Sequence, residues 1–286
     1  MNVSIVIPVY NEAPQLDACL SAIAAQLVKP LEVIVIDNNS SDESAAVASC
    51  YDFVSLLSES KQGVVHARTT GFDAAQGEII ARIDADSVLP ADWVQTIQAI
   101  FTDRELQATS GSAHYYDAAG AGLVNRIDHF FRRRLERQLE GAVYLWGANM
   151  AMRRSAWQAV RPLLCQRGDQ HEDFDIAIHL QQLGGKVTFD DRLQASVSSR
   201  RIDVPYLDFM SYVMVSPKTY AQHGIKSRWH MYSVVAACAL GYLPGRILYR
   251  GYDETNDGFS LLQLFKTRHL ESRIDPTSNV APATDY

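Results

Sequence analysis

Four short apolar runs, rich in Val and Ile, constrain the fold of this 286-residue chain more than any other feature. They read VSIVIPV at 3–9, LEVIVID at 31–37, DFVSLL at 52–57 and EIIARI at 78–83. Three of them are nearly continuous rather than alternating, which is typical of strands that are buried on both faces. The runs therefore predict a sheet that other elements cover on its two sides.

Helical patterns separate these runs. Residues 14–27 open with Pro14 and repeat Leu and Ile at helical spacing, a second pattern begins near Ser44, and a third covers 64–75. The alternation of strand and helix predicts a parallel sheet with right-handed crossovers. The ligand of such a sheet is expected beyond the carboxyl ends of its strands.

The segments at these strand ends are PVYNE at 8–12, DNNSSD at 37–42 and DADS at 84–87. None of the three is the glycine-rich turn that lets a dinucleotide pyrophosphate lie against a helix N-terminus. The sequence therefore argues against a nicotinamide or flavin enzyme. Any phosphates of the ligand have to be neutralised in another way.

Asp84 and Asp86 follow the fourth run and form an acidic pair. In a strand, residues i and i+2 point to the same side, so the two carboxylates converge, and Ala85 is small enough to let a ligand approach. A hard cation, Mg²⁺ or Mn²⁺, would relieve their repulsion and take further ligands from water and substrate phosphates. The alternative is an acidic strand-to-turn junction. The same pattern, DFD at 173–175, falls in a predicted helix, where i and i+2 do not face each other.

The composition is that of a soluble globular chain, with 47% hydrophobic and 21% charged residues. A formal net charge of -7 argues against nonspecific binding of nucleic acid. The charge is uneven, because residues 1–125 hold 5 Lys and Arg against 16 Asp and Glu, whereas residues 126–286 hold 21 against 17. The second half is therefore basic.

The four cysteines are widely spaced and show neither a disulfide spacing nor a metal-binding spacing, which favours a reducing compartment. They are Cys19, Cys50, Cys165 and Cys238. The N-terminus enters a strand without a secretory signal pattern, and the longest apolar run, VVAACAL, is too short to span a bilayer. We therefore expect a cytoplasmic protein with no transmembrane helix.

Five longer segments share one order and spacing with a known family. They are VSIVIPVYNE, EVIVIDNNSSDES, GVVHARTTGFDAAQGEIIARIDADS, GANMAMRRSAW and HEDFDIAIHLQQLGGKV, and they fall within residues 3–190. In this arrangement they resemble glycosyltransferase family 2, the inverting, nucleotide-sugar-dependent enzymes of the GT-A fold. The resemblance implies an α/β fold with a Rossmann-like, mostly parallel sheet flanked by helices and a helical C-terminal extension.

The implied organisation has a GT-A catalytic domain at 1–200. Its nucleotide-sugar half is expected at 1–115 and its acceptor half at 116–200. A helical extension at 201–270 and a polar tail without predicted structure at 271–286 complete the chain.

The resemblance also assigns the donor side of the site. The residues implied there are Pro8, Tyr10, Glu12, Asp37, Asn39, Arg68, Asp84, Ala85 and Asp86. Among them, Asp37 would accept a hydrogen bond from the base, Asp84 would face the ribose or the sugar, and Asp86 would bind the metal with Asp84 beside it. Taken singly, three alternatives remain: Tyr10 as a core residue, 38–42 as an ordinary turn and helix cap, and Arg68 as a solvated helix residue.

The implied catalytic residues lie in the HEDFD segment. The family uses the aspartate of this ED pair as general base, here Asp173, and Glu172 is the next candidate. A sugar hydroxyl needs such a base as its bond to the anomeric carbon forms. Asp173 shares a helical face with Ala177 and Leu180, which places its carboxylate partly inward. The structural alternative is that Glu172 forms a capping box with Asp169.

The residues implied on the substrate side are Gly147, Asn149, Arg200 and Arg201. Gly147 would let the backbone approach a sugar, with a simple strand entry as the alternative. The segment ASVSSRR at 195–201 lacks the histidine that other members carry as a further metal ligand. Ser198, Ser199 or water would then complete the metal shell, and either arginine would suit the diphosphate.

The sequence thus predicts a metal-dependent inverting glycosyltransferase. It would move a sugar from a nucleoside diphosphate sugar, with UDP favoured, to a hydroxyl of a glycan or lipid-linked acceptor, and its cation would be Mn²⁺ or Mg²⁺. One alternative, a sugar nucleotidyltransferase, needs a basic glycine-rich signature that PVYNE lacks. The other, a noncatalytic nucleotide-sugar-binding protein, would be favoured by loss of Asp86 or Asp173, and both are present.

The basic second half leads to a further hypothesis, peripheral contact with an anionic membrane on its inner face. NRIDHFFRRRLERQLE at 125–140 mixes Arg with Phe and Leu, and YVMVSPKTY and MYSVVAACALGYLPGRILYR join apolar stretches to Lys218, Arg246 and Arg250. Such segments suit an interface between lipid and water. The alternative is ordinary helices packed on the sheet with solvated arginines.

Overall fold

The computed structural model describes residues 1–138, 144–165, 170–225 and 228–266. The amino-terminal part consists of β1 (Val3–Val9), α1 (Ala13–Ala24), β2 (Glu32–Asp37), α2 (Ser44–Ser49), β3 (Val54–Ser58), α3 (Val64–Ala74), β4 (Ile79–Ile83), α4 (Trp93–Ile100) and β5 (Leu106–Tyr115). The remainder consists of α5 (Ala121–Gln138), β6 (Asn149–Arg153), α6 (Arg154–Val160), η1 (Arg161–Leu163), α7 (Glu172–Gln182), β7 (Lys186–Val197), η2 (Arg200–Asp203), α8 (Tyr206–Val213), α9 (Val215–Gln222), α10 (Arg228–Arg250), β8 (Tyr252–Asp253), β9 (Gly258–Phe259) and η3 (Gln263–Phe265).

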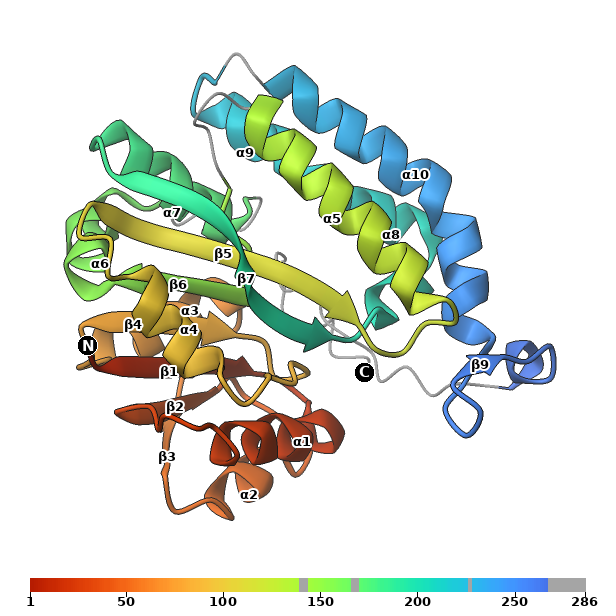
Figure 1. Cartoon of the computed structure of the whole chain (residues 1–286), viewed down its shortest axis with the longest axis horizontal. Coiled ribbons are helices and arrows are strands. Elements are labelled where there is room, and N and C mark those ends of the chain that lie inside the picture. The colour runs from red at the N-terminus through yellow and green to blue at the C-terminus, as the bar shows by residue number, and fades with distance from the viewer. Residues whose placement is uncertain (139–143, 166–169, 226–227, 267–286) are drawn as a thin grey trace, which may run out of the picture.

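Seven strands form one sheet in the order β3-β2-β1-β4-β6-β5-β7 (Figure 1). Strand β1 pairs in parallel with β2 and β4, β2 pairs in parallel with β3, and β5 pairs in parallel with β7. Strand β6 runs antiparallel to both of its neighbours, β4 and β5. The predicted α/β class is confirmed, and the four apolar runs form β1 to β4.

Helices cover both faces of the sheet. On one face, α1, α2 and α4 pack on the strands in a cluster that includes Trp93. On the other face, α3, α6 and α7 enclose Phe72 and Trp157, whose rings lie 5.0 Å apart. Consecutive residues of β1, such as Ile5 and Val6, enter opposite clusters. This explains why the strand sequences are continuously apolar.

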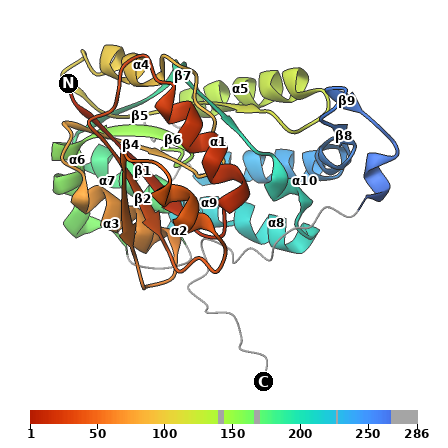
Figure 2. The ribbon, with the colours of Figure 1, turned by 90° about the horizontal axis from the view of Figure 1, so that it is seen from below.

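A helical layer made of α5, α8, α9 and α10 lies beyond the carboxyl ends of the strands (Figures 1 and 2). Helix α10 packs on η2, α8 and α9 and also touches α5. Helix α5 comes from the middle of the chain, so in space this layer combines residues from both sides of position 200. The domain division at 200 stays a prediction, and the expected tail at 271–286 lies outside the described residues.

Helix α10 corrects one expectation. In the described part of the chain, one segment, Trp229–Arg250, is long and apolar enough by length and composition to cross a membrane. The expectation that every apolar segment is too short to span a bilayer is therefore wrong. The apolar segment continues beyond VVAACAL, because the Gly, Tyr and Pro that interrupt it carry no charge. In the structure its inner side packs against protein, where Met231 and Tyr242 are buried.

Candidate active site

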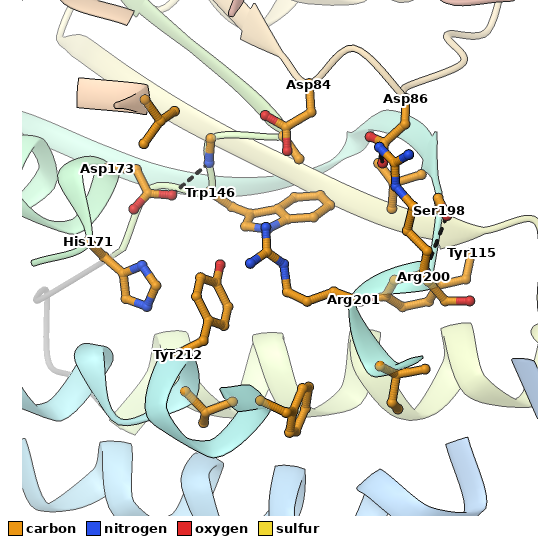
Figure 3. Close-up of a pocket in the computed structure, with 18 of the residues that line it drawn as sticks. Asp84, Asp86, Tyr115, Trp146, His171, Asp173, Ser198, Arg200, Arg201 and Tyr212 are labelled. Atoms are coloured by element: carbon orange, nitrogen blue, oxygen red, sulfur yellow. Dashed lines mark hydrogen bonds and ion pairs between the residues drawn. The ribbon is translucent and has the colours of Figure 1, made fainter. Parts of the chain in front are cut away.

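A cavity of about 650 Å³ lies at the carboxyl ends of β1 and β4, on the side of the sheet that the parallel topology predicts. Its wall combines these strand ends with the N-terminus of α7, with η2 and with the inner sides of α8 and α10 (Figure 3). The ionisable side chains of this wall include Glu12, Arg82, Asp84, Asp86, His171, Glu172, Asp173, Arg200 and Arg201. Most of the predicted site residues therefore meet in one cavity.

Asp84 and Asp86 stand side by side in the wall, with buried Ala85 between them (Figure 3). The cavity exposes 43% of the Asp84 side chain and 11% of the Asp86 side chain. Partial loss of hydration at the cavity wall raises the pKa of Asp84; Arg82 opposes this shift and the Asp86 carboxylate adds to it. Two carboxylates that disfavour each other's charge form a site that attracts a cation.

Arg200 neutralises part of this acidic wall. Its Nη2 donates to Asp86 Oδ2 at 2.8 Å and to Glu12 Oε2 at 2.5 Å. Burial disfavours the charge of Arg200, but the two carboxylates outweigh it and raise the pKa of this guanidinium. One arginine after β7 thus ties together the segments that follow β1 and β4.

The two serines beside Arg200 have other partners. Asp117 accepts hydrogen bonds from Ser198 Oγ, from Ser199 N at 2.7 Å and from Ser199 Oγ at 2.6 Å. Ser198 and Ser199 line the cavity, and the expectation that one of them or water completes a metal shell at Asp86 stays a prediction. Arg200 is the member of this segment that contacts Asp86.

A buried ion pair lies below the acidic pair. Arg82 Nη1 donates to Glu172 Oε1 at 2.7 Å, and Arg82 Nη2 lies 3.3 Å from Asp84 Oδ1. Burial would raise the pKa of Glu172, but the charges of Arg82 and Arg68 outweigh it and hold that pKa below its ordinary value. The described start of α7 has no side-chain cap, and Asp169 lies outside the described residues. Glu172 therefore serves as the partner of Arg82 and is a weak base.

Asp173 occupies the first turn of α7 and is 8% exposed. Its Oδ2 accepts a hydrogen bond from Gly147 N at 2.8 Å, and its Oδ1 accepts one from Phe174 N at 2.9 Å. Burial and the adjacent Glu172 carboxylate raise the pKa of Asp173 to about 7, against the charge of Arg82 and these two N–H groups. A carboxylate that titrates near neutral pH suits a general base.

The predicted sugar loop has a different role for each of its two residues. Gly147 lies in the wall, and a Cβ at this position would meet Arg82 Nη1 at 2.5 Å. A larger residue would therefore push the buried Arg82 guanidinium aside, so the glycine makes room for protein and not for a sugar. Asn149 is fully buried; it accepts from Trp93 Nε1 at 3.0 Å and donates to backbone carbonyls of β5 and β7. The assignment of Asn149 to substrate is corrected, because its amide holds the sheet to α4.

Some of the residues that are expected to contact the nucleotide line the cavity, and others do not. Pro8 and Tyr10 line the cavity beside Glu12. Asp37 Oδ1 instead accepts from Ser40 N at 3.3 Å, and Asn39 donates to the loop after β3. Asp37 ends β2 and Asn39 lies in the turn that follows it, and neither is among the described residues that line the cavity. Their contact with a base stays a prediction.

Arg68 lies behind the wall and is 1% exposed. Its guanidinium packs on the rings of Phe72 and Trp157, and its Nη1 donates to the backbone oxygen of Glu172 at 3.4 Å. Burial lowers the pKa of Arg68 to about 10, with Glu172 opposing the shift and Arg82 adding to it. The alternative of a solvated helix residue is corrected, because Arg68 is buried and supports the start of α7. Its assignment to the nucleotide side stays a prediction, since it lies behind the wall and not in it.

Aromatic residues complete the wall that faces the acids. Arg201 lies over the Tyr212 ring at 4.1 Å, and its guanidinium reaches between Trp146 and Tyr212 (Figure 3). The His171 ring lies 4.9 Å from the Tyr212 ring. Sequence reasoning missed Trp146, His171 and Tyr212. Their local signal is that Trp146 directly precedes the GANMAMRR segment and that His171 is the first residue of HEDFD.

Two curated relatives share sequence with this chain. Glycosyltransferase AglE of Haloferax volcanii is 28% identical over 179 residues, which is 59% of each chain. The undecaprenyl-phosphate 4-deoxy-4-formamido-L-arabinose transferase of Sodalis glossinidius is 27% identical over 215 residues, 72% of this chain and 59% of that protein. The chain thus spans 59% of the length of both relatives.

Two solved structures share the GT-A fold. Mannosyltransferase PcManGT from Pyrobaculum calidifontis, in complex with GDP-Man and Mn²⁺, has a TM-score of 0.65 at 20% identity, covering 86% of this chain and 72% of that one. Glucosyl-3-phosphoglycerate synthase from Mycobacterium tuberculosis, with Mn²⁺, UDP-glucose and phosphoglyceric acid, has a TM-score of 0.54 at 19% identity, covering 78% and 80%. Residues 4–161 match the description Glycosyl transferase family 2, and the chain belongs to that family.

Proposed function

We propose that this cavity transfers a sugar from a nucleoside diphosphate sugar to an acceptor hydroxyl, with inversion at the anomeric carbon. One observation carries the proposal. An acidic pair that attracts a cation, Asp84 and Asp86, and a carboxylate that titrates near neutral pH, Asp173, line the same cavity. Family membership and the nucleotide-sugar complexes of the fold neighbours support it.

The acidic pair fits a divalent cation. Asp84 opens to the cavity, and the mutual repulsion of Asp84 and Asp86 is the kind that a hard cation with oxygen ligands relieves. When bound there, Mn²⁺ or Mg²⁺ would neutralise the diphosphate as it leaves. Arg200 already contacts Asp86, so the cation and this guanidinium share the carboxylate or exchange at it.

Asp173 indicates the chemistry of the acceptor. Its N–H partners, Gly147 and Phe174, hold the carboxylate in a fixed orientation at the cavity wall. A hydroxyl has to lose its proton as it attacks, and a base with a pKa near 7 can accept that proton. A phosphate oxygen is already ionised at neutral pH and needs no base. The site therefore favours a hydroxyl over a phosphate as the attacking group.

A thermal-shift series with nucleoside diphosphates tests the donor side. We expect UDP or GDP to raise the melting temperature more in the presence of Mn²⁺ than in its absence, because a ligand of the native state stabilises by mass action. Two nucleotides serve as controls: AMP, which lacks a diphosphate, and NAD⁺, which is a dinucleotide. If no nucleoside diphosphate shifts the melting temperature with Mn²⁺, the proposed function fails.

We also propose that the acceptor is lipid-linked and that the helical layer rests on the membrane. Large apolar side chains are exposed along α5 and α10, among them Leu123, Phe130, Leu240 and Leu243. The inner side of α10 gives the cavity an apolar wall. The name of the Sodalis relative specifies undecaprenyl phosphate, which supports a lipid carrier; in our proposal the attacking group is a hydroxyl of a glycan on that carrier and not the lipid phosphate itself.

The structure changes the expected basis of membrane contact. Arg246 and Arg250 both bind Asp203, which is 1% exposed, and Arg133 binds Asp191. These arginines therefore hold the helical layer to the rest of the protein. We therefore propose that exposed apolar side chains carry most of the contact, with exposed basic residues such as Arg126 and Lys218 beside them.

Vesicle sedimentation tests this contact. We expect Leu240→Glu with Leu243→Glu to abolish binding to vesicles that contain anionic lipid, whereas wild-type binding persists in part at high salt. Leu27→Glu, at an exposed leucine on the α1 side of the molecule, is the matched control. Unchanged binding of the double variant, or absence of wild-type binding to anionic and neutral vesicles alike, contradicts the proposal.

A further inference from the structure

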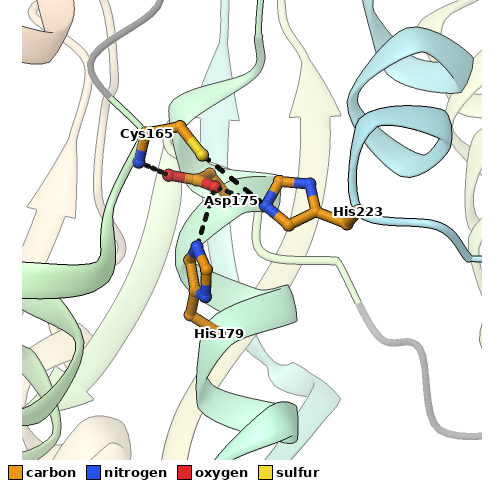
Figure 4. Close-up of side chains that lie close together, drawn as sticks. All are labelled: Cys165, Asp175, His179 and His223. Atoms are coloured by element: carbon orange, nitrogen blue, oxygen red, sulfur yellow. Dashed lines mark hydrogen bonds and ion pairs between the residues drawn. The ribbon is translucent and has the colours of Figure 1, made fainter.

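A second group of chemically distinctive side chains lies outside the cavity wall, between α7, α9 and the segment that follows η1 (Figure 4). It consists of Cys165, Asp175, His179 and His223, and one ligand atom from each lies within 4.8 Å of the others. Asp175 is 2% exposed, and the side chains of His179 and His223 are 13% and 7% exposed. The group is therefore sheltered from solvent.

The distances match those between the ligands of a tetrahedral metal. Asp175 Oδ1 lies 2.9 Å from His223 Nε2 and 3.4 Å from His179 Nε2, and Cys165 Sγ lies 3.8 Å from His223 Nε2. Around zinc, metal–ligand bonds of about 2.0–2.3 Å in a tetrahedron place neighbouring ligand atoms about 3.3–3.7 Å apart. These three separations bracket that range, and all four ligand atoms lie within 4.8 Å of one another.

The outer nitrogen of each histidine fixes its tautomer. His223 Nδ1 lies 2.9 Å from the backbone oxygen of Thr219, and His179 Nδ1 lies 3.1 Å from Gln182 Oε1. Both oxygens only accept, so each Nδ1 carries the proton and donates it. In the neutral imidazole the lone pair is then on Nε2, which faces the other members of the group. Such a second hydrogen bond is usual for histidines that bind a metal.

Two atoms at the centre of the group lack hydrogen bonds. Within the described part of the chain, Asp175 Oδ1 and His179 Nε2 are both buried without a hydrogen-bond partner. Asp175 Oδ2, in contrast, accepts from Cys165 N at 2.8 Å, which holds the cysteine in place. A carboxylate oxygen that faces imidazole lone pairs is repelled unless a cation or an added proton lies between them.

We propose that Cys165, Asp175, His179 and His223 form a zinc site with a structural role. A thiolate with two imidazoles selects Zn²⁺ over Mn²⁺ or Mg²⁺, and four protein ligands leave no open position for catalysis. Asp175 and His179 are i and i+4 on α7, so they present their ligand atoms on one face of that helix.

The site would fasten the catalytic helix. Helix α7 carries Asp173 in its first turn, and His223 directly follows α9 of the helical layer. A metal bound by both helices would hold α7 against the layer that closes the cavity. Metal binding of this kind contributes directly to folding stability.

Metal analysis of the full-length chain, purified without chelator, tests the proposal. We expect about one Zn²⁺ per chain in the wild type, retained in Asp86→Asn and lost in Cys165→Ser and His223→Asn. Removal of zinc should lower the melting temperature of the wild type and leave that of Cys165→Ser unchanged. Cys50→Ser, at an exposed cysteine, is the matched control and should keep its zinc.

Cobalt gives a spectroscopic readout of the thiolate ligand. Titration of metal-free wild type with Co²⁺ should produce a thiolate-to-cobalt charge-transfer band and the intense visible bands of four-coordinate cobalt, and Zn²⁺ should remove both. Cys238 lines the cavity and Cys19 Sγ lies 3.9 Å from the backbone oxygen of Asp84, so the band is assigned to Cys165 only if Cys165→Ser lacks it. A wild type that takes up neither metal except through Asp86, or a cobalt spectrum without the thiolate band, overturns the proposal in favour of a hydrogen-bonded His–Asp network.

Discussion

The Asp173→Asn variant is expected to lose about 10²-fold or more in turnover while it binds the sugar nucleotide nearly as tightly as the wild type. The amide can still accept the N–H of Gly147, so the local backbone keeps a partner. What it cannot do is take the proton of the attacking hydroxyl. Steady-state kinetics with calorimetry of donor binding separate these two effects.

The pH dependence gives the same residue a second signature. The carboxylate form of Asp173 is the active base, and its pKa is raised to about 7. We therefore expect kcat/KM of the wild type to fall about tenfold for each pH unit below that value. Asp173→Asn should lack this limb, because asparagine does not titrate.

The contribution of Asp173 to the stability of the fold should decrease as the pH rises, whereas the activity should increase. A raised pKa means that the folded state holds this proton more tightly than the unfolded chain, in which the group titrates near pH 4. The stabilisation is present below pH 4 and is lost as the pH rises through about 7. Relative to the wild type, the melting temperature of Asp173→Asn should accordingly be higher at pH 8 than at pH 5.

Glu172→Gln is the control for the adjacent carboxylate. It leaves the buried Arg82 guanidinium with one fewer charged partner, so it should destabilise the fold by about 3 kcal/mol. Its remaining folded fraction should keep the pH limb that Asp173 produces. Near-normal turnover of Asp173→Asn, or loss of the limb in Glu172→Gln alone, would move the general base to Glu172.

Asp86→Asn should remove most of the Mn²⁺-dependent part of nucleoside diphosphate affinity, about 10-fold or more, equal to about 1.4 kcal/mol. The carboxylate of Asp86 lies in the cavity wall 2.8 Å from Arg200, and a neutral amide in its place binds a hard cation far less well. Calorimetry of UDP and GDP with and without Mn²⁺ measures the difference.

A matched control removes the same charge elsewhere. Asp52→Asn, at an exposed position before β3, should leave the Mn²⁺-dependent affinity unchanged. If Asp86→Asn binds nucleotide as the wild type does in both conditions, the cation does not act through this carboxylate. Weakened binding without Mn²⁺ but equal binding with it would instead assign Asp86 to the positioning of Arg200.

The parts of the fold that the sequence predicts are those that local periodicity encodes. Continuous apolar runs give β1 and β2 because both faces of each strand are buried. The position of Asp84 and Asp86 just beyond β4 follows from where the apolar run ends, but the two residues lie in the segment after the strand, so the strand alternation expected to align them does not apply. The antiparallel course of β6 has no such local signature, since it depends on the sheet neighbours that the strand acquires.

Side-chain partners were harder to predict, because they depend on contacts between distant segments. Arg200 binds Glu12 across 188 positions of sequence, so its role at the acidic pair is invisible to spacing. Asn149 and Arg68 occupy the motif positions that the resemblance assigns to ligands, yet their buried polar groups are turned toward protein. Position in a motif therefore fixed the neighbourhood of these residues but not the direction of their side chains.

The Cys165–Asp175–His179–His223 group shows the same limit. The spacing of the cysteines in the sequence does not indicate this group, because only one cysteine belongs to it. The fold brings that cysteine together with an aspartate and two histidines from three segments of the chain. The only local trace is the i, i+4 spacing of Asp175 and His179, which occurs on many helices without a metal. Tertiary structure alone brings Cys165 and His223 to it.

Release of nucleoside diphosphate from the sugar nucleotide tests the central claim most directly. The wild type would be incubated with Mn²⁺, a lipid extract as acceptor source, and the donor whose nucleotide gives the largest thermal shift. We expect nucleoside diphosphate to appear together with glycosylated lipid of inverted anomeric configuration, and both to fall about 10²-fold or more in Asp173→Asn. Tight binding of the donor with no loss of its sugar would contradict the account and identify the chain as a noncatalytic nucleotide-sugar-binding protein.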